Sequence, residues 1–426
     1  MSDLLHQAEN AKGASLKMFS LSSDVKNSAL MAIAGLLEER AETIFIANAK
    51  DLEEAGKTGL SMPLQKRLLF NEQKLAVVIE GLTQLTRLAD PIGKILMGTQ
   101  MDEDLSLYRV SCPIGVIGII FESRPDALVQ IASLCLKTSN AVFLKGGSEA
   151  LNTNRVLASI IEEASLAAGI PDGWITLLES RTEVTEMLGL EEYIDLLIPR
   201  GSNEFVRYIM EHTKIAVLGH ADGVCHVYVH KDAAPDMARR VVVDSKTQYV
   251  AVCNAAETLL IDQDIADSLL PDLAAALREK GVTLHGCERA AKMLSIDRVT
   301  DWHKEYLDYE MSVRIVDGPE EAIEHINRYG SGHTDAIVTS NREIAEIFMN
   351  AVDSGNVFWN SSTRFSDGFK YGFGAEVGVS TSKIHARGPV GLEGLVTYKY
   401  KIYGNGQIVE DYASGKSSFT HRPIEE

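Results

Sequence analysis

The sequence predicts an α/β protein with two doubly wound parallel-sheet domains and a small strand region suited to oligomerisation. Its 426 residues are too many for one ordinary hydrophobic core, which indicates more than one domain. Short apolar strands alternate with helical segments between residues 115 and 218, and again between residues 224 and 359. This alternation is typical of parallel sheets whose two faces are covered by helices.

The first ninety residues predict helices, and a strand follows them. Apolar residues recur at helical spacing within 25–47 and within 75–85, so each helix is expected to bury one face. Pro91 and Gly93 interrupt this pattern. Residues 105–110 then read as a strand, which we expect at the edge of a sheet.

The first parallel sheet is predicted to begin at residue 115. Its expected strands are 115–121, 141–144, 174–178, 194–198 and 215–218. The helices expected between them are 126–138, 149–169, 183–188 and 202–212. Short apolar strands joined in this way predict a doubly wound, nucleotide-binding arrangement in outline.

A second α/β set begins near residue 223. Its predicted strands are 224–229, 258–261, 282–285, 312–316, 335–338 and 356–359, with helices between most of them. Residues 395–403 again resemble a strand, and the tail beyond them is polar. We therefore expect a helical N-terminus and dinucleotide-binding domain over 1–222 and a catalytic domain over 223–382. The tail over 383–426 is expected to return to the first domain and to join segment 98–112 in oligomerisation.

Charge and hydropathy exclude several classes of function. The formal net charge of −19 leaves no surplus of the Lys and Arg that nucleic acids and acidic membranes attract. The chain lacks an apolar run of the ~18 residues that span a bilayer, and its first residues lack the features of a secretory signal. We expect a cytoplasmic protein. A phosphorylated substrate is compatible with this charge, because a few local cations and backbone N–H groups can bind one phosphate.

Cys253 is the residue that we expect to react. The five cysteines are odd in number and widely spaced, without a Cys-x-x-Cys pair, so we expect neither disulfides nor a structural metal. Cys253 is expected in a loop between a helix over 235–246 and a strand over 258–261, where a substrate can approach its thiol. Cys135 and Cys225 are expected within an apolar helix and an apolar strand, where a cysteine serves packing.

Two strand-to-helix turns are candidates for cofactor binding. The first parallel strand is not followed by Gly-x-Gly-x-x-Gly. Instead, Lys145, Gly146 and Ser148 follow one predicted strand, and Gly201 and Ser202 follow another. Both turns open helices at the same edge of a parallel sheet, where glycines and backbone N–H groups suit a diphosphate. The alternative for either turn alone is an ordinary turn glycine with a serine that caps a helix.

Sequence motifs occur in five segments along nearly the whole chain: 115–126 (Gly-Val-Ile-Gly-Ile-Ile-Phe-Glu-Ser-Arg-Pro-Asp), 252–260 (Val-Cys-Asn-Ala-Ala-Glu-Thr-Leu-Leu), 360–368 (Asn-Ser-Ser-Thr-Arg-Phe-Ser-Asp-Gly), 371–378 (Tyr-Gly-Phe-Gly-Ala-Glu-Val-Gly) and 380–389 (Ser-Thr-Ser-Lys-Ile-His-Ala-Arg-Gly-Pro). In sequence and in order, they resemble the motifs of γ-glutamyl phosphate reductases, a branch of the aldehyde dehydrogenase superfamily.

This resemblance implies an aldehyde dehydrogenase-like fold and a reaction in proline biosynthesis. The implied reaction is the NADPH-dependent reduction of L-glutamyl 5-phosphate to L-glutamate 5-semialdehyde, with release of phosphate. Cys253 would form a thioester, Lys145 would hold the cofactor ribose, and the turn at Gly201 and Ser202 would lie near the diphosphate. The preference for NADPH follows from the family alone. The resemblance also implies a homodimer or homotetramer and a transient association with the upstream glutamate kinase.

His220 and Ser123 stand where the sequence departs from the superfamily's pattern. Hydrolysing aldehyde dehydrogenases carry a Glu just before the second domain, which activates water against the thioester. Counting back from Gly223, that position is His220, which fits a thioester that exchanges with phosphate. The alternative is that His220 is a solvent-facing loop residue without a role. The oxyanion-holding Asn of those enzymes maps to Ser123 or nearby, so we expect Ser123 and the Cys253 backbone N–H as oxyanion donors.

Arg364, Arg124 and Asn254 are candidates for substrate binding. Arg364 sits in a Ser/Thr-rich turn after a predicted strand, which suits a carboxylate. Arg124 precedes Pro125 and suits a phosphate, and Asn254 adjoins the nucleophile. For each arginine the alternative is a salt bridge at the surface or between domains. The sequence does not show which group lowers the pKa of Cys253. The competing functions are an acylating aldehyde dehydrogenase that uses an acyl-CoA, and an inactive oligomeric scaffold.

Overall fold

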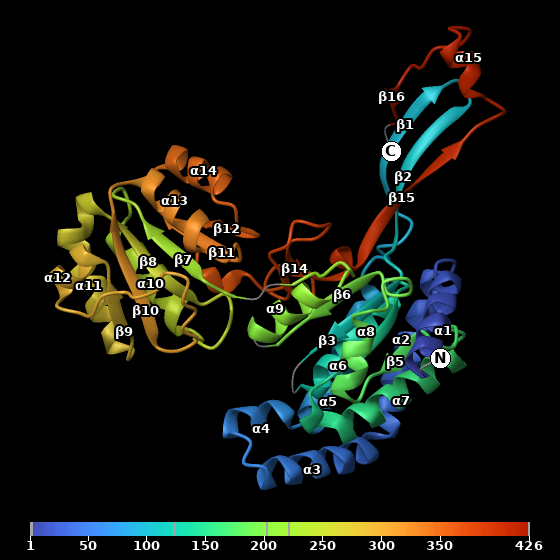
Figure 1. The fold of residues 1–426 in the computed structure, drawn as a ribbon, viewed down its shortest axis with the longest axis horizontal. Helices are drawn as coiled ribbons and strands as arrows, with labels where there is room; N and C mark the ends of the chain where they lie inside the picture. The colour runs from blue at the N-terminus through green and yellow to red at the C-terminus, as the bar shows by residue number, and fades with distance from the viewer. Residues whose placement is uncertain (1–2, 122–123, 202, 220–221, 425–426) are drawn as a thin grey trace.

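The computed structural model describes residues 3–121, 124–201, 203–219 and 222–424. Figure 1 shows a body of helices and sheet that holds the N-terminus, a second α/β body, and a strand arm that projects away from both and carries the C-terminus. Within these residues, no helix is both long and apolar enough to cross a membrane.

Helices cover the first body, as the periodicity of the first ninety residues predicts. They are α1 (Asp3–Met18), α2 (Ser23–Glu39), α3 (Ala41–Lys57), α4 (Met62–Leu68) and α5 (Glu72–Arg87). Leu30, Ile33 and Leu37 are fully buried one helical turn apart along α2 and belong to the same core as the first sheet. The helical prediction is therefore confirmed for the described part of this region.

The first sheet is parallel and doubly wound. Its strands are β3 (Val116–Ile120), β4 (Ala141–Lys145), β5 (Ile175–Leu177) and β6 (Leu196–Pro199), in the spatial order β5-β4-β3-β6. The helices that follow these strands are α6 (Pro125–Lys137), α7 (Leu151–Ala167), α8 (Arg181–Met187) and α9 (Asn203–His212). The chain starts at β3, winds outward to β5 and then returns to β6 on the other side. Ligands of such sheets bind beyond the carboxyl ends of the strands, where the winding reverses.

The strand predicted over 215–218 was wrong in extent. Val217 makes a single bridge with Leu197 of β6, supported by hydrogen bonds of 2.8 Å from Leu197 N to Ala216 O and from Leu218 N to Leu197 O. Two residues further along this edge stands Pro199, which has no N–H to continue the ladder. The pairing therefore stops after one bridge.

The second body contains a longer parallel sheet. Its strands are β7 (Cys225–Val229), β8 (Ala256–Asp262), β9 (Thr283–Gly286), β10 (Glu310–Val316), β11 (Thr334–Val338) and β12 (Asn356–Trp359), in the order β12-β11-β7-β8-β10-β9. Its helices are α10 (Pro235–Thr247), α11 (Gln263–Glu279), α12 (Glu288–Leu294), α13 (Pro319–Tyr329) and α14 (Arg342–Ala351). Val227 and Val229 enter one core and Tyr228 enters the opposite one, because successive side chains of a strand point to opposite faces.

The chain returns from the second body to the first through β13 (Gly378–Ser380) and β14 (Gly388–Val390), which pair antiparallel. Short 3₁₀ helices occur at Ser148–Ala150, Thr363–Phe365 and Leu392–Leu395. Val377, Val390 and Leu395 are buried in the core of the first sheet. This segment therefore spans both bodies.

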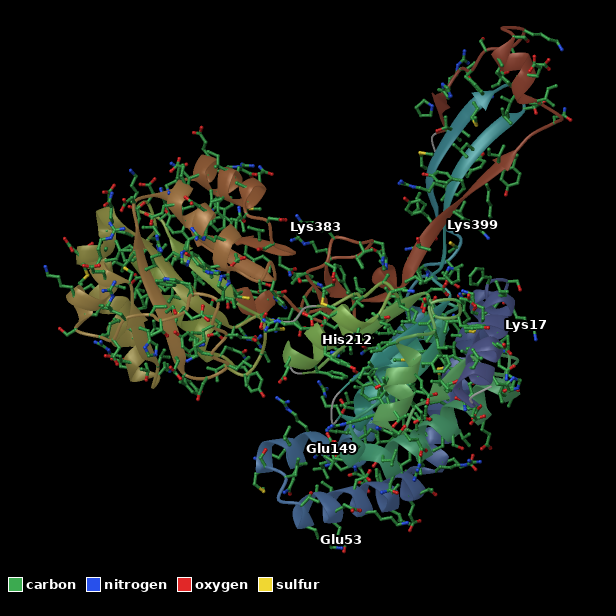
Figure 2. The ribbon with its side chains drawn as sticks, in the orientation of Figure 1. Lys17, Glu53, Glu149, His212, Lys383 and Lys399 are labelled. Carbon is green, nitrogen blue, oxygen red and sulfur yellow. The ribbon has the colours of Figure 1, made fainter. Side chains whose placement is uncertain are left out.

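The arm is an antiparallel sheet in the order β15-β2-β1-β16, with α15 (Val409–Ala413) at its end. Its strands are β1 (Ile95–Asp102), β2 (Leu105–Pro113), β15 (Val396–Tyr403) and β16 (Arg422–Pro423). Figure 2 labels Lys399 on β15. The edge position expected for the strand at 105–110 was wrong, because β2 pairs with β1 on one side and with β15 on the other. The distant β15 supplies the second neighbour, which local sequence does not reveal.

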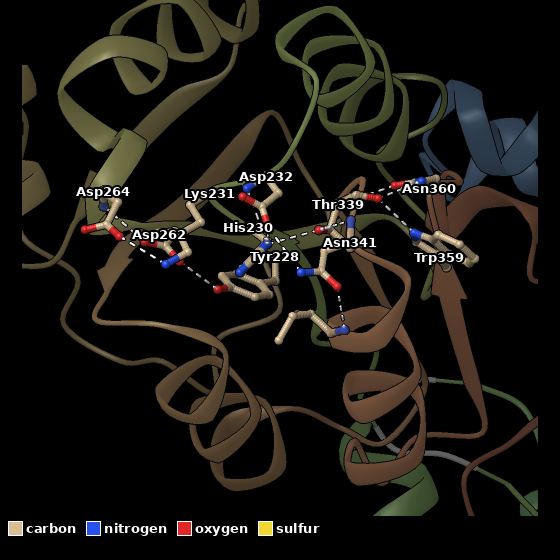
Figure 3. Close-up of polar contacts among 11 residues, drawn as sticks. Tyr228, His230, Lys231, Asp232, Asp262, Asp264, Thr339, Asn341, Trp359 and Asn360 are labelled. Carbon is tan, nitrogen blue, oxygen red and sulfur yellow. Dashed lines mark hydrogen bonds and ion pairs between the residues drawn. The ribbon is translucent and has the colours of Figure 1, made fainter.

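The carboxyl end of the second sheet is a polar network, shown in Figure 3. His230 Nδ1 lies 3.0 Å from Thr339 Oγ1, and Tyr228 donates a hydrogen bond of 3.2 Å to Asp262 Oδ2. Trp359 Nε1 donates to Thr339 O at 2.9 Å. These groups lie at or just beyond the carboxyl ends of β7, β8, β11 and β12, and they serve as hydrogen-bond partners for one another. The network therefore joins the strands at this end, and the opposite, amino end of the sheet faces the first body.

A buried ion pair anchors one loop at that amino end. Lys246 Nζ, near the end of α10, lies 2.8 Å from Glu257 Oε2, near the start of β8, and both side chains are fully buried. Burial raises the pKa of Glu257 to about 7, although the neighbouring Lys246 ammonium acts in the opposite direction. Because Lys246 precedes the loop over 248–255 and Glu257 follows it, the ion pair holds the two ends of this loop together.

We expect Lys246→Met to destabilise the fold by about 3–5 kcal/mol, because it leaves a buried carboxyl group without its cation. Without that cation the folded-state pKa of Glu257 rises further. A carboxyl group with a raised folded-state pKa loses stability as pH rises from its unfolded to its folded pKa, and for wild-type Glu257 that loss ends at about 7. In the variant the loss continues above that pH, so the deficit should grow from pH ~7 to pH ~9. Urea unfolding at several pH values measures this. Lys57→Met, at an exposed ion pair with Glu53, is the control. A loss that does not vary with pH would contradict the prediction.

Candidate active site

A cavity of about 680 Å³ lies where the carboxyl end of the first sheet meets the amino end of the second. Pro199 and Gly201, at the end of β6, line it from the first body, and Cys253 and Leu307 line it from the second. Gly378 of the returning segment completes the wall. The cavity therefore lies at the crevice where the first sheet reverses its winding.

Backbone contacts hold Cys253 at the wall of this cavity. It lies in the loop between α10 and β8, as predicted, and its side chain is half-buried. A Cβ atom at position 223 would lie 2.3 Å from the Cys253 carbonyl oxygen and 2.4 Å from its Cα, so this close approach requires Gly223. Cys225 Sγ donates to the same carbonyl oxygen at 3.1 Å. The loop therefore packs directly against the start of β7.

The surroundings of Cys253 favour its thiolate. Burial raises the pKa of this thiol, but the charge and hydrogen bond of His333, together with the charge of Arg200, outweigh burial and the opposing charge of Glu305. The resulting pKa is below that of an ordinary cysteine. Burial instead raises the pKa values of Cys135 and Cys225. Because the thiolate is the nucleophilic form, Cys253 is the cysteine best suited to react.

His333 is the group that the sequence did not reveal. It is buried and directly precedes β11, and its Nδ1 lies 2.8 Å from Thr334 Oγ1, which fixes the orientation of the ring. The sequence signal was a polar Gly-His-Thr turn before a predicted strand. Its position beside Cys253 depends on the amino ends of β11, β7 and β8 being neighbours, which the order of strands along the chain does not show.

We expect His333→Ala to raise the pKa of the Cys253 thiol. One unit of upward shift reduces the thiolate fraction about tenfold at neutral pH, so alkylation by iodoacetamide should slow by about that factor or more. The pH at half-maximal alkylation rate should move upward. His212→Asn, at the exposed end of α9, is the control that keeps the wild-type profile. An unchanged profile in His333→Ala would assign the low pKa to another group.

The predicted cofactor residues divide between two places. Lys145 ends β4, and its Nζ donates a hydrogen bond to Gly146 O. Burial lowers the pKa of Lys145, and the charges of Glu149 and Arg181 act on it in opposite directions. Ser148 follows at the start of a 3₁₀ helix, beside Glu149, which Figure 2 labels on the first body.

The second turn is the one that reaches the cavity. Gly201 follows β6 and lines the cavity beside Cys253, whereas Lys145 and Ser148 lie along the same sheet edge and outside the cavity lining. Gly146 packs closely against Asn154, because a Cβ there would lie 2.3 Å from Asn154 Nδ2 and force that side chain to move. Ser202 lies outside the described residues, as do the predicted oxyanion donor Ser123 and the predicted departure His220.

Of the three residues predicted to bind substrate, one lines the cavity and two do not. Arg124 lines the cavity and forms an ion pair of 2.7 Å with Asp126. Arg364 is not among the lining residues; its Nε donates to Gln248 Oε1 at 3.0 Å, and its charge interacts with the Cys253 thiolate. Asn254 is buried, and its Nδ2 donates to Ser366 O at 2.7 Å. Arg364 and Asn254 thus link the loop over 248–255 to the segment over 364–366.

Charged residues complete the cavity wall, and apart from Arg124 the sequence did not predict them there. Among the described residues that line it, the arginines are Arg67, Arg124 and Arg200, and the glutamates are Glu204, Glu305 and Glu376. Arg200 lies in the turn that the sequence predicted to bind the cofactor, but Arg200 itself was not predicted as a site residue. Arg67 lies in α4, and a surface cation in an N-terminal helix carries no signal that it reaches a distant site. Within the described ranges, no cluster of His, Cys, Asp or Glu has the geometry of metal ligands.

Comparisons with known proteins agree with this geometry. The aldehyde dehydrogenase family model matches residues 2–293. The γ-glutamyl phosphate reductase of Acetivibrio thermocellus is 60% identical over 419 residues, which cover 98% of this chain and 97% of the relative. The chain belongs to the γ-glutamyl phosphate reductase branch of the aldehyde dehydrogenase family. It is therefore an oxidoreductase of that family, and the resemblance found in the sequence is confirmed.

Solved structures of this family share the fold. The crystal structure of γ-glutamyl phosphate reductase from Thermotoga maritima matches with a TM-score of 0.92 and 38% identity, covering 96% of this chain and 100% of that one. An acetylating aldehyde dehydrogenase from Geobacillus thermoglucosidasius matches with a TM-score of 0.65 at 17% identity, covering 95% of this chain and 97% of that one. The second match shows a common fold alone. The predicted α/β, aldehyde dehydrogenase-like fold is confirmed.

Proposed function

We propose that the protein catalyses the NADPH-dependent reduction of L-glutamyl 5-phosphate to L-glutamate 5-semialdehyde, with release of phosphate, in proline biosynthesis. The observation that supports this best is a thiol of lowered pKa at the wall of a cavity that arginines also line. The substrate carries two anionic groups, a phosphate and an α-carboxylate, and guanidinium groups bind both kinds of anion well. The reductase of Acetivibrio thermocellus, identical at 60% of aligned positions, supports the same reaction.

In the first step of the proposed reaction, the Cys253 thiolate attacks the acyl carbon. A C–S bond forms, the C–O bond to the phosphate breaks, and phosphate leaves with the electron pair. His333 favours this step because its charge and hydrogen bond hold Cys253 in the ionised form. The Cys253 backbone N–H, with Ser123, is proposed to donate to the developing oxyanion.

Arg124 and Arg200 line the cavity near the same thiol, and we assign them to the phosphate and the carboxylate without dividing these roles. Arg67 is a third guanidinium in the lining. Arg364, which the sequence predicted to bind the substrate carboxylate, is proposed instead to support the thiolate electrostatically, because its charge interacts with Cys253. Asn254 is proposed to orient the loop through Ser366, which its amide already contacts.

The residues at the carboxyl edge of the first sheet fit a phosphorylated dinucleotide. NADPH, when bound, supplies the hydride that reduces the thioester. Lys145 and Ser148 are proposed to bind the adenosine ribose and its 2′-phosphate, and Gly201 and Ser202 are proposed to lie at the diphosphate. Arg181, the first residue of α8, joins them, because its charge acts on Lys145. A second cation that acts on Lys145 suits the phosphate that distinguishes NADPH from NADH.

We expect Arg181→Ala to raise the KM for NADPH about 10- to 100-fold and to leave the KM for NADH nearly unchanged, because only NADPH carries the 2′-phosphate. Lys145→Ala should raise both, since its proposed partner includes the ribose. Initial rates over both cofactors measure the two constants. Arg342→Ala, at the start of α14 in the second body, is the control. Equal effects of Arg181→Ala on both cofactors would remove it from the 2′-phosphate site.

We expect Cys253→Ala to lose at least ~10³-fold in turnover, as removal of a covalent nucleophile does. Cys287→Ala, at a half-buried thiol that caps α12, should keep its activity. Reductase assays of the purified variants decide this. Substantial activity in Cys253→Ala would exclude a thioester at this residue.

The same proposal predicts that continuous oxidation of the aldehyde by NADP⁺ requires inorganic phosphate. With L-glutamate 5-semialdehyde and NADP⁺, one burst of NADPH per site should form and then stall until phosphate is added. His220, in place of a water-activating Glu, supports this exchange over hydrolysis. Stopped-flow absorbance follows the burst. Release of the stall by CoA and not by phosphate would favour the acyl-CoA reaction, and steady oxidation without phosphate would contradict the proposed role of His220.

A further inference from the structure

Asp126 is a buried acidic residue next to the cavity that the proposed mechanism does not use. It is 7% exposed and lies in the first turn of α6. Arg124 and Ala127, close to it in sequence, both line the cavity. Pro125 begins the helix, a position that suits its fixed φ angle, and a carboxylate in the first turn suits the helix dipole. The Asp126 side chain therefore has a fixed place beside the cavity wall.

Two cations from different segments meet at this carboxylate. Arg124 Nη2 lies 2.7 Å from Asp126 Oδ2, and Lys74 Nζ lies 3.6 Å from Asp126 Oδ1. Lys74 stands in the first turn of α5, where its backbone N–H donates a hydrogen bond of 3.1 Å to the capping residue Asn71. Each oxygen of Asp126 thus faces one cation, and the carboxylate joins the start of α6 to the start of α5.

Lys74 extends this link to a second arginine of the cavity. Its Nζ also donates a hydrogen bond of 2.8 Å to Arg67 O, near the end of α4. Arg67 and Arg124 both line the cavity. Asp126 therefore holds Arg124 directly by its guanidinium group, and through Lys74 it holds the backbone of Arg67.

The alternative is that the pair between Arg124 and Asp126 serves stability alone. Its burial is uneven, because the Asp126 side chain is 10% exposed and the Arg124 side chain is 53% exposed. A guanidinium group has five N–H donors in a planar fork, so a contact at Nη2 leaves others for an anion. One end of the pair is therefore anchored, and the other end is presented to the cavity.

We propose that Asp126 is a positioning residue that holds Arg124 and Arg67 in place to bind one anionic group of the substrate. This inference rests on the proposed reaction. A guanidinium group that is already held in place loses less conformational freedom when the anion binds, which raises affinity. The phosphate and the α-carboxylate share the planar or forked oxygen geometry that guanidinium groups recognise, and the experiment distinguishes the two.

The test uses the oxidative direction with NADP⁺, where the two anions arrive on separate molecules. L-Glutamate 5-semialdehyde brings the α-carboxylate, and inorganic phosphate is the second substrate. In Asp126→Asn we expect KM for one of these two to rise about 10-fold and kcat to stay within about threefold. A rise in KM for phosphate assigns the two arginines to the phosphate group, and a rise in KM for the aldehyde assigns them to the carboxylate.

Three further variants separate positioning from general damage. Asp126→Glu keeps the charge and should restore most of the affinity, because a neighbouring cavity of about 430 Å³ that Asp126 and Lys74 line has room for one more methylene group. Lys74→Met should raise the same KM, and its effect should be less than multiplicative with that of Asp126→Asn, because the two residues act through one link. Asp24→Asn, at an exposed carboxylate in the first turn of α2, should leave both KM values unchanged.

Alkylation of Cys253 by iodoacetamide at the wild-type rate checks that each variant keeps an intact nucleophile. If Asp126→Asn does not fold, Lys74→Met decides the question. Unchanged KM values, equal rises in both, or a fall in kcat alone overturn the inference while the reaction itself stands. A lower KM also overturns it, because Asp126 would then chiefly neutralise Arg124. Failure of the wild-type protein to oxidise L-glutamate 5-semialdehyde with phosphate overturns the proposed function and this inference together.

Discussion

The buried ion pair between Lys246 and Glu257 is the constraint on which the site depends. It joins the end of α10 to the start of β8, and the loop between them holds Cys253. Burying two charges is costly unless each finds its partner at short range, so this pair holds the two ends of the loop close together. Glu257 also accepts a hydrogen bond from Leu307 N, which ties the end of the loop that holds Cys253 to the segment before β10. One pair thus positions two walls of the cavity.

The site joins two kinds of sheet edge. The carboxyl end of the first sheet supplies glycine turns and Arg200, as expected of a nucleotide-binding sheet. The second sheet presents its amino end instead, and His333, Cys225 and Cys253 all stand before or at the first residues of their strands. The carboxyl end of that second sheet is closed by the network around Thr339. The first sheet therefore contributes its carboxyl end to the cavity, and the second sheet contributes its amino end.

Much of this arrangement was predictable from the sequence, and the remainder depends on contacts between distant segments. The alternation of strands and helices and the loop position of Cys253 follow from local periodicity. The position of His333 beside Cys253 depends on the order of the strands within the sheet. The order of these strands along the chain does not reveal it. Arg67 reaches the cavity from an N-terminal helix, and Glu305 from a loop without a local motif. The single bridge at Val217 reflects the missing N–H of Pro199, a detail that a run of apolar residues conceals.

The separation between Lys145 and the cavity lining has an evolutionary consequence. The groups that set the pKa of Cys253 are His333, Glu305 and Arg200, whereas Lys145 and Arg181 lie along the outer part of the first sheet edge, where β4 ends and α8 begins. Substitutions in that outer part leave the electrostatic surroundings of the thiol intact. With Lys145 and Arg181 in the proposed cofactor role, redox-carrier preference can drift between lineages, or be redesigned, while the surroundings of the Cys253 thiol are inherited unchanged.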